Sequence, residues 1–535
     1  MLKTSKGMLV TLLAVGWLSR DTLAGEDVRV ETNKLACMVR YEDFGARGDG
    51  RTDDTAAIVR AHAYANRRGL PVQANASATY YIGGQDTPVI IQTDTDLGSA
   101  RFIIDDRKVE NRHTHVFSVY SALPSTQPKG ITSLKSGQRR INIELPKTCV
   151  VCVTDSNTKR YIRRGLNQNA GSSQTDVFLV DKNGRVDERT PILWDFDQIT
   201  HMVAYPVDEA PLRINGGRFT TLANAAESEY IYYARGISIR RSNVVIDGLE
   251  HRITGEGDHG APYAGFITIR DCANVTVRNT TLNGHKTYQT IGSAGKPVFM
   301  GSYDISVTRA LNVSFINCRQ FDEINDHTRW GIMGSNYSKN LLYDRCELSR
   351  FDAHQGVAGV TIRNSVLGHA GINAIGSGML VVENTTVYGR SFINLRSDYG
   401  STWQGEFVIR NCTFVPAGGR PVSASLIGGS NDGQHDFGYA CCMPSRIDIN
   451  GLRIDDSRHP KGYQGPTVFA DFNRSFKNAA YEEKFPYVKS REVILENITT
   501  VSGKPLHISS NPVMFKDVAV KHNGKANKPA GGDSQ

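Results

Sequence analysis

The sequence predicts a right-handed parallel β-helix, a solenoid in which the strands of successive coils stack on one another. Three observations lead to this fold class. A short pattern of alternating apolar residues around an asparagine recurs over the second half of the chain. Glycine is abundant, with 51 residues against 19 prolines, and few long stretches show helical periodicity. Finally, 535 residues are more than one ordinary globular core holds, so the chain has either several domains or a repeat architecture.

The repeating pattern reads apolar, any residue, Asn or a substitute, a small residue, any residue, apolar. Clear copies cover residues 277–282, 362–367, 382–387 and 409–414, with Asn at the third position of each. Successive centres lie between 19 and 46 residues apart; the shortest spacings, 19 and 20, fit one bare coil, and longer ones fit coils that carry loops. Degenerate copies are centred on Gly248, Asn317, Arg345, Gly451 and Asn497.

The asparagine of the pattern marks a sharp turn, because Asn tolerates left-handed backbone better than other residues with a Cβ. Stacked asparagines would form a hydrogen-bonded ladder, which explains the Asn-x-Ser/Thr sequences at several centres better than glycosylation does. The nine cysteines suggest no disulfide framework, and Cys149 and Cys152 lack a second pair to complete a zinc site. The small residues that follow the centres predict a tight interior stack of Cys318, Cys346, Ser365, Thr385 and Cys412.

The first element in chain order is an export signal over residues 1–24. Lys3 and Lys6 precede an apolar run over residues 8–17, and residues 22–24 offer a small-residue cleavage site. The run is too short to span a bilayer, and no later segment has the length that a membrane helix needs. We therefore expect a secreted or periplasmic protein without a membrane span.

Residues 25–104 are expected to form an N-terminal cap and the first coils. Asp53 or Asp54 begins a helix that runs to about Arg68, where Gly69 and Pro71 end it. The segment around the helix start, YEDFGARGDGRTDDTAAI, resembles the N-terminal signature of the pectate-lyase-like β-helix superfamily. That superfamily includes pectin hydrolases and lyases, glucanases and phage tailspikes. The resemblance is close over residues 39–104, extends loosely to about residue 500, and implies that the helix caps the open end of the coils.

Residues 105–230 interrupt the coil pattern. Apolar segments at 149–153, 176–180 and 191–195 are separated by turn-rich stretches, which predicts an inserted antiparallel β subdomain beside the groove. The coils resume over residues 231–518. The Lys-, Asn- and Gly-rich residues 519–535 are expected to form a flexible tail.

Residues able to do chemistry are densest in the coils from 322 to 403, on loops that would project from one face of the solenoid. Arg350, His369 and Arg390 follow the last apolar residue of their repeats by two or three positions. Equivalent positions of neighbouring coils stack about 4.8 Å apart. We therefore expect these three side chains to form a line on one surface, and His327 and His354 to form another.

These residues predict cleavage of a uronic-acid-containing polysaccharide by β-elimination. That reaction neutralises the uronate carboxylate, removes the proton next to it and protonates the departing oxygen. The catalytic side chains assigned to these steps are His354 or His327 as base, Arg329 or Arg396 as carboxylate clamp, Asn373 as helper and Tyr399 as acid. The side chains expected to bind substrate are Lys286, Trp330, Arg350, His369, Arg390 and Trp403, with the two tryptophans stacking on sugar rings.

The motifs of the superfamily's pectin hydrolases, Asn-Thr-Asp, Gly-His-Gly and Arg-Ile-Lys, are absent from the chain. Residues 324–327, Ile-Asn-Asp-His, resemble a stretch of the calcium-dependent pectate lyases, but the arginine-bearing motif that follows it there is not recognisable. We therefore predict no metal site and no certain cofactor, with calcium as the alternative. The chain is more similar to an unusual polysaccharide lyase, of the β-helical glycosaminoglycan-lyase kind, than to a pectate lyase proper.

Two other functions stay open. A glycoside hydrolase needs two carboxylates about 5–10 Å apart, which Asp326 with Asp352, or Asp322 with Glu323, could supply. A non-catalytic glycan-binding or tailspike-like protein is the third interpretation. The net charge of +8 is modest and no Lys/Arg block stands out, so the expected partner is an acidic polysaccharide and not a nucleic acid. The sequence indicates no oligomeric state.

Overall fold

The computed structural model describes residues 38–522 and 525–526, apart from 85, 110–111, 229–231, 287 and 331–332. Within these ranges, the side chains of Met300, Trp330, Met333, Lys525 and Ala526 are not described. The expected export signal at residues 1–24, Cys37 and most of the expected tail at 519–535 lie outside the described residues.

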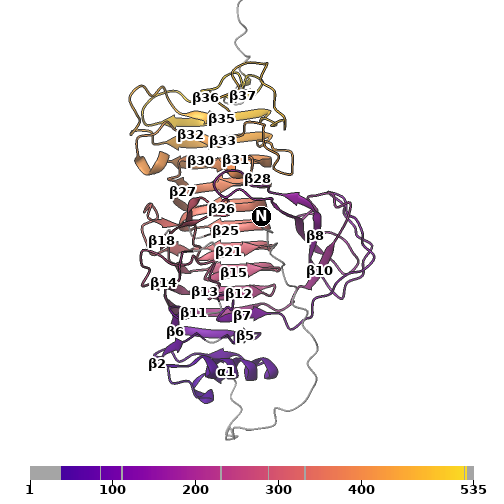
Figure 1. Cartoon of the computed structure of the whole chain (residues 1–535), viewed down its shortest axis with the longest axis vertical. Coiled ribbons are helices and arrows are strands. Elements are labelled where there is room, and N and C mark those ends of the chain that lie inside the picture. Colours follow the sequence, from indigo (N-terminus) through magenta and orange to yellow (C-terminus); the bar gives the residue numbers. More distant parts are fainter. Residues whose placement is uncertain are drawn as a thin grey trace, which may run out of the picture. The chain divides into compact units, whose positions relative to one another are not determined.

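The unit that begins at Met38 is almost entirely β-structure, with a single α-helix among the described residues (Figure 1). Parallel strands of successive coils stack into three long faces of one continuous sheet, as the repeat predicted. We call these faces the first, second and third sheets, in the order in which a coil visits them. Alternate side chains point inward and form the main hydrophobic core, which follows the stack.

The three sheets pair strands in chain order. The first sheet stacks β5 (Val89–Ile91), β7 (Phe117–Tyr120), β12 (Ile237–Arg240), β15 (Ile267–Arg270), β21 (Ile305–Thr308), parts of β25 (Met333–Asp344), β26 (Glu347–Arg363) and β27 (Val366–Ala374), then β30 (Ser391–Leu395), β32 (Ser425–Gly428), β34 (Thr467–Phe469) and β36 (His507–Ser509). The second stacks β1 (Val39–Arg40), β3 (Val72–Gln73), the starts of β6 (Thr95–Asp105) and β11 (Leu212–Leu222), β13 (Val244–Asp247), β16 (Ala273–Arg278), β22 (Leu311–Ile316), the ends of β25 and β26, β28 (Gly376–Glu383), the starts of β31 (Trp403–Phe414), β33 (Arg446–Ile454) and β35 (Glu492–Thr500), and β37 (Ala519–His522), with β38 (Lys525–Ala526) antiparallel to β37. The third stacks β2 (Asp49–Asp53), β4 (Thr79–Ile82), the ends of β6 and β11, β14 (Glu250–Thr254), β17 (Thr281–Leu282), β23 (Arg319–Gln320), the starts of β26 and β27, β29 (Thr386–Val387) and the ends of β31, β33 and β35.

The predicted centres of the repeat lie at the turn between the second and third sheets. All nine have left-handed backbone, with φ between 45° and 76°. Asn317 Nδ2 donates to Asn279 Oδ1 at 2.8 Å, and Asn384 Nδ2 donates to Asn364 Oδ1 at 3.1 Å. The expected ladder is present in separate segments, because three of the centres are arginine or glycine.

A second asparagine ladder, which the repeat pattern did not reveal, lies at the turn between the first and second sheets. Asn274 donates from Nδ2 to Asn243 Oδ1 at 3.0 Å, Asn312 to Asn274 at 2.9 Å, and Asn340 to Asn312 at 2.9 Å. All four residues have positive φ. They lie before the apolar residues of the pattern, outside the six positions that define it.

The predicted interior stack lies directly after the turn. Cys318, Cys346, Ser365, Thr385 and Cys412 are all buried. The N–H of Cys346 donates to Ser365 Oγ at 3.0 Å, and the N–H of Ser365 donates to Thr385 Oγ1 at 3.4 Å. The eight cysteines in the described part of the chain are free, and burial raises the pKa of the Cys412 thiol to about 11. The Cys412 thiol is therefore structural, since a protonated buried thiol is unreactive.

The single helix, α1 (Thr55–Arg68), covers the first coil and contacts β1, β3 and β5. The Asp53 carboxylate accepts the Thr55 N–H at 3.0 Å, so the helix begins where the sequence predicted. Gly69 adopts φ +66° and donates its N–H to the Ala65 carbonyl, which ends the helix at the predicted glycine.

Residues 121–211 leave the coils between β7 and β11 and form an insertion, on the right-hand side of Figure 1. Its strands β8 (Cys149–Arg160), β9 (Ser172–Val180) and β10 (His201–Pro206) pair antiparallel in the order β10–β8–β9 around a core of their own. The insertion is narrower than the expected 105–230, because β7 and β11 belong to the coils. Likewise β37 pairs with β35, so the stack passes the expected boundary at 518.

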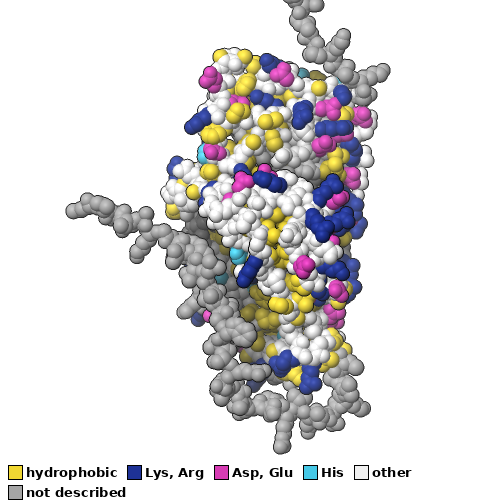
Figure 2. All heavy atoms as spheres, turned by 90° about the vertical axis from the view of Figure 1, so that its right-hand side faces the viewer, with side chains coloured by type: hydrophobic (Ala, Val, Ile, Leu, Met, Phe, Trp, Pro, Cys, Tyr) yellow, Lys and Arg dark blue, Asp and Glu magenta, His cyan; other side chains and the backbone are white. Residues whose placement is uncertain are grey.

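Two antiparallel strand pairs decorate the coils: β18 (His285–Lys286) with β24 (Arg329–Trp330), and β19 (Tyr288–Ile291) with β20 (Pro297–Met300). On the face that Figure 2 turns to the viewer, basic and acidic side chains are interspersed along one edge. Within the described residues, no helix has the length and apolar character required to cross a membrane.

Candidate functional site

A cleft of about 750 Å³ lies along the first sheet, where β26, β27 and β30 follow one another in the stack. We call it the arginine cleft, because Arg163, Arg350, Arg390 and Arg396 line it. It brings together seven of the twelve side chains that the sequence predicted as catalytic or substrate-binding: His327, Arg350, His354, His369, Asn373, Arg390 and Arg396.

The stacking register explains why these residues meet. Asp352 on β26 pairs with Asn373 on β27, which pairs with Asn394 on β30. Asn394 Nδ2 donates to Asn373 Oδ1 at 2.8 Å, and Asn373 donates to the Ala370 carbonyl at 2.8 Å. Side chains at equivalent positions of three coils, Asp352, Asn373 and Asn394, therefore form one line. Arg350 pairs with Gly371 and not with His369, so Arg350, His369 and Arg390 line the same cleft without occupying the equivalent positions that the spacing predicted.

The acidic side chains of the cleft are held by its arginines. Asp352 is fully buried; it accepts a hydrogen bond from Arg396 Nη1 at 2.9 Å and forms a second ion pair with Arg350. Arg396 also donates to Asp398, from Nη2 at 2.8 Å and from Nε at 3.2 Å. Arg163, from the insertion, donates to Asp398 Oδ2 at 2.9 Å.

This network sets the charge of the cleft. Burial alone would raise the pKa of the Asp398 carboxyl, but Arg396 and Arg163 lower it to about 2. Four arginines and one aspartate, Asp398, line the cleft, and Asp352 is buried beneath it, so the cleft carries a net positive charge. Arg390 is exposed, and no ion pair is found for it within the described residues.

The histidines of the cleft are neutral near neutral pH. Burial, followed by the nearby Arg396 guanidinium, lowers the pKa of His354 to about 3. Partial burial also lowers the pKa of His369 and of His327, whose ring centroids lie 4.6 Å apart. His369 Nδ1 lies 3.0 Å from the Ile324 carbonyl oxygen, which only accepts, so Nδ1 carries the proton and Nε2 is the basic nitrogen.

Lys286 and Arg329 do not line the arginine cleft; they lie on the paired strands β18 and β24. Arg329 forms ion pairs with Asp322 at 3.5 Å, with Asp326 at 3.7 Å and with Glu256 at 3.9 Å. A guanidinium surrounded by three carboxylates is not available as a clamp for a substrate carboxylate, in contrast to the expectation for Arg329. The side chain of Trp330, the other predicted residue of β24, lies outside the described residues.

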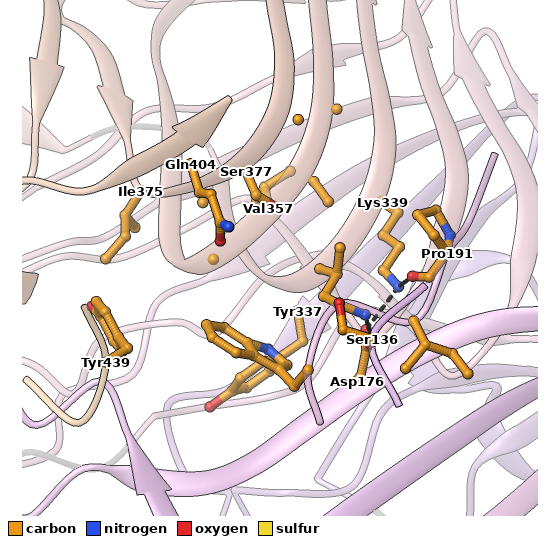
Figure 3. Close-up of a pocket in the computed structure, with 18 of the residues that line it drawn as sticks. Ser136, Asp176, Pro191, Tyr337, Lys339, Val357, Ile375, Ser377, Gln404 and Tyr439 are labelled. Carbon is orange, nitrogen blue, oxygen red and sulfur yellow. Dashed lines mark hydrogen bonds and ion pairs between the residues drawn. The ribbon is translucent and has the colours of Figure 1, made fainter. Parts of the chain in front are cut away.

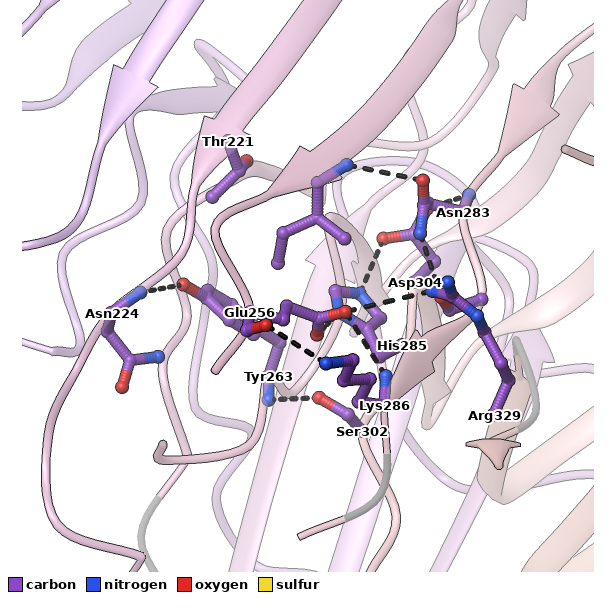
Figure 4. A network of polar contacts seen from close by, with 12 residues as sticks. Thr221, Asn224, Glu256, Tyr263, Asn283, His285, Lys286, Ser302, Asp304 and Arg329 are labelled. Atoms are coloured by element: carbon purple, nitrogen blue, oxygen red, sulfur yellow. Dashed lines mark hydrogen bonds and ion pairs between the residues drawn. The ribbon is translucent and has the colours of Figure 1, made fainter. Parts of the chain in front are cut away.

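A buried network holds these two strands on the coils (Figure 4). His285 contacts Asp304 from Nε2 at 3.0 Å and Glu256 from Nδ1 at 3.2 Å, and Asp304 also binds His251. Burial alone would lower the pKa of His285, but the carboxylates of Asp304 and Glu256 raise it to about 10. Lys286 Nζ donates to the Glu256 carbonyl at 3.1 Å, so its ammonium group helps to fix this loop.

Tyr399 and Trp403 are buried, with 1% and 0% of their surface exposed. Trp403 donates its indole N–H to the Gly378 carbonyl at 2.9 Å, and its ring is therefore not available to stack on a sugar. Tyr399 packs edge-on against His354, with ring centroids 5.6 Å apart, and does not line the arginine cleft. The structure thus corrects the expected roles of Trp403 in sugar stacking and of Tyr399 as proton donor, because both need access to the substrate.

Sequence reasoning missed two contributors to the cleft. Arg163 lies in the insertion, 235 residues before its partner Asp398, and no local pattern connects the two. Phe299, on β20, lines the cleft with 63% of its surface exposed.

The described residues contain no group of three or more His, Cys, Asp or Glu side chains arranged to hold a metal ion.

No family model matches the chain. A stretch of 133 residues is 32% identical to the depolymerase specific for capsule KL64 of Klebsiella phage P510, and the match covers 21% of this chain and 13% of that protein. The match therefore spans a small part of the relative's length.

Two phage tailspikes are among the solved structures that the chain resembles. The tailspike gp61 of Pseudomonas phage phi297 has a TM-score of 0.55 at 12% identity, over 91% of this chain and 84% of that one. The tailspike gp49 of Pseudomonas phage LKA1 has a TM-score of 0.49 at 14% identity, over 90% of this chain and 84% of that one. At such identities the first likeness shows a shared fold and nothing about activity.

Proposed function

We propose that the protein is a polysaccharide-processing enzyme that cleaves a uronic-acid-containing chain by β-elimination in the arginine cleft. The observation that carries the proposal is the combination of exposed Arg390 with neutral histidines in a cleft whose own carboxylates are neutralised. Such a cleft attracts a polyanion and offers an unprotonated nitrogen beside it.

Binding of the uronate begins with charge. Arg390 offers the substrate carboxylate a guanidinium that no described acidic residue occupies, and Arg350 lines the same cleft from the neighbouring coil. Arg396, which the sequence suggested as the clamp, is engaged by Asp352 and Asp398 and instead positions the wall of the cleft. Phe299 takes over the sugar-stacking role expected of the tryptophans, because its ring is exposed in the cleft.

The base removes the proton next to the carboxylate, the electron pair forms a carbon–carbon double bond, and the bond to the departing glycosidic oxygen breaks. His354 is neutral and lines the cleft, so it is the base in this proposal, with His327 as the alternative. The amide line of Asn373 and Asn394 can donate to the enolate-like charge that develops on the carboxylate. The departing oxygen takes its proton from solvent.

Glycoside hydrolysis is the second candidate, and the electrostatics disfavour it in this cleft. A hydrolase needs a protonated carboxylic acid as well as a carboxylate. The pKa of Asp398 is lowered, and Asp352 is buried between two arginines. Asp326, which pairs with Arg329 outside the cleft, also has a lowered pKa, from its hydrogen bonds to Thr328.

The relatives support a polysaccharide as substrate. The partial match to a capsule depolymerase favours an enzyme that degrades a bacterial glycan, and the fold shared with a tailspike is compatible with binding alone. Right-handed coils belong to this proposal, since crossover connections between parallel strands are right-handed in about 98% of cases. We also propose that the protein acts outside the cytoplasm and that its substrate is an acidic polysaccharide of the glycosaminoglycan or capsular kind.

The test is to incubate the purified protein with a panel of uronate-containing polysaccharides and to record both ultraviolet absorbance and reducing ends. A rise in the absorbance of the unsaturated product supports the lyase. New reducing ends without absorbance would establish the hydrolase instead. Retention on the polymers with neither signal would reduce the function to binding.

A further inference from the structure

A second and larger cleft, of about 1010 Å³, lies between the insertion and the coils (Figure 3). The insertion contributes residues of β8 and β9 and of the segment that contains Trp194, and the coils contribute the turns between the first and second sheets. We call it the aromatic cleft, because Trp194, Tyr337 and Tyr439 line it. None of its residues was predicted to act on substrate.

The aromatic cleft exposes apolar surface with polar edges. The ring centroids of Trp194 and Tyr439 lie 6.3 Å apart, and the Arg160 guanidinium lies 4.7 Å from the Trp194 ring. Met379 and Val488, also in its lining, are 52% and 55% exposed, among the most exposed large apolar side chains described. Gln404, labelled in Figure 3, is exposed and also lines the cleft.

Most charges of the aromatic cleft are paired within the protein. Lys339 and Asp176 are buried together and form an ion pair of 2.7 Å. Arg160 is held by Gln174 Oε1 at 2.8 Å and by the Gly438 carbonyl. A ligand that enters this cleft therefore meets aromatic rings, neutral polar groups and the Arg160 guanidinium, in contrast to the four arginines of the arginine cleft.

One short segment of the insertion borders both clefts. Arg160 and Tyr161 line the aromatic cleft, and Arg163 lines the arginine cleft. The Tyr161 ring packs against Tyr337 at 5.7 Å on one side and against Tyr399 at 6.0 Å on the other. Tyr161 also has left-handed backbone, with φ +55°, an uncommon conformation for an aromatic residue. The two clefts are therefore neighbours that meet at this segment.

We propose that the aromatic cleft binds uncharged sugar residues of the polysaccharide whose acidic residues occupy the arginine cleft. This inference rests on the proposed function and extends it to the substrate class: a heteropolysaccharide with neutral sugars between its uronates. A neutral sugar has an apolar C–H face and hydroxyl edges. The face stacks on Trp194, and the hydroxyls meet side chains such as Gln404 and Ser377.

The experiment is affinity electrophoresis of the full chain in gels that contain galactomannan or dextran as neutral probes, or alginate as a uronate probe. Trp194→Ala should weaken retardation by at least one neutral polymer at least fivefold and leave alginate retardation unchanged, and Trp194→Phe should restore it. Arg390→Ala should weaken retardation by alginate and leave retardation by the neutral polymers unchanged. Tyr120→Ala, an exposed aromatic on β7 outside both clefts, is the matched control.

Because Trp194 also packs on the core of the insertion, Gln404→Ala provides a second variant that removes an exposed side chain only. Two results would overturn the proposal even if uronate cleavage is found. One is that no neutral polymer retards the wild-type protein. The other is that retardation by the neutral polymers is unchanged in both variants. A Trp194→Ala variant that differs from the wild type in sedimentation would instead identify the cleft as a contact between copies, and would also overturn it. Absence of uronate cleavage with neutral-polymer retardation intact would refute the proposed function alone.

Discussion

Arg163 donates a hydrogen bond from Nε to Oδ2 of Asp398 at 2.9 Å, and so connects the insertion to the wall of the arginine cleft. Asp398 in turn fixes Arg396, which binds the buried Asp352. The chain of contacts runs from a subdomain inserted early in the sequence to the strands that carry the candidate base. The insertion is therefore part of the candidate site.

The first prediction follows from this contact. Arg163→Ala removes one of the two arginines that hold Asp398, so Arg396 and the neighbouring His354 lose part of their support. We expect kcat/KM on the uronate substrate to fall about 10- to 100-fold, the scale of a small misplacement of reacting groups. Stability should fall by about 1–3 kcal/mol, because a hydrogen bond to a charged group is lost.

The neighbouring residue supplies the control. Arg164 pairs with Asp432 at 2.7 Å and does not line the cleft. Arg164→Ala should therefore leave kcat/KM unchanged, as measured by product absorbance, although it removes a similar ion pair. Equal losses in both variants would mean that Arg163 acts only by attaching the insertion.

The second prediction concerns Arg390, the exposed arginine of the cleft. Arg390→Ala should raise KM for an acidic polysaccharide at least fivefold and make KM less dependent on salt, because one attractive charge is removed. Stability should change by less than about 0.5 kcal/mol, as for most surface substitutions. Arg218→Ala is the matched variant, since Arg218 is 53% exposed and pairs with Glu250 away from the cleft. An unchanged KM for Arg390→Ala would remove Arg390 from the site.

The sequence predicted the coils well because their determinants are local. Left-handed backbone at Asn364 or Asn384 requires only the residue itself and its place in the six-residue pattern. The same pattern placed Arg350, His369 and Arg390 in one cleft, but not their register, because the pairing of β26 with β27 shifts between Leu348 and Arg350.

Burial and long-range pairing were beyond the reach of this reasoning. Trp403 and Tyr399 stand in a polar stretch, and only the packing of the segment around Tyr439 against them determines that they are inside. Arg329 is the residue type expected of a carboxylate clamp, but it forms an ion pair with Glu256, a residue 73 positions earlier. Arg163 reaches Asp398 because the insertion folds back on the coils, and no periodic signal encodes that contact.

The third prediction concerns His354. His354→Gln should lower kcat by at least about 100-fold, since general-base catalysis contributes about 10²–10⁴-fold. His459→Gln, at a partly exposed histidine outside the cleft, should have no effect. Because the pKa of His354 is lowered to about 3, wild-type kcat should not fall as the pH passes the ordinary histidine value of 6.5. A decline of kcat centred at 6.5 would contradict His354 as base, and one centred a little below that value would point to His327 or His369, whose pKa values are also lowered.

The same pKa makes a prediction about stability. The folded protein keeps His354 neutral down to about pH 3, whereas the unfolded chain takes up a proton below about pH 6.5. Lowering the pH from 6.5 to 3 therefore favours the unfolded chain. His354→Gln should lose less stability over this range than the wild type, as measured by urea unfolding at pH 7 and pH 4. A greater loss in the variant would contradict the lowered pKa.

The fourth prediction separates backbone conformation from hydrogen bonding in the asparagine ladder. Asn384 has φ +45° and donates to Asn364 at 3.1 Å. Asn384→Gly removes the hydrogen bond but suits the backbone, whereas Asn384→Ala removes the hydrogen bond and adds left-handed strain of about 1–2 kcal/mol. The alanine variant should therefore have the lower urea midpoint, and both should cleave substrate normally. If the glycine variant were equally destabilised, the side-chain ladder rather than the left-handed turn would be what stabilises this coil.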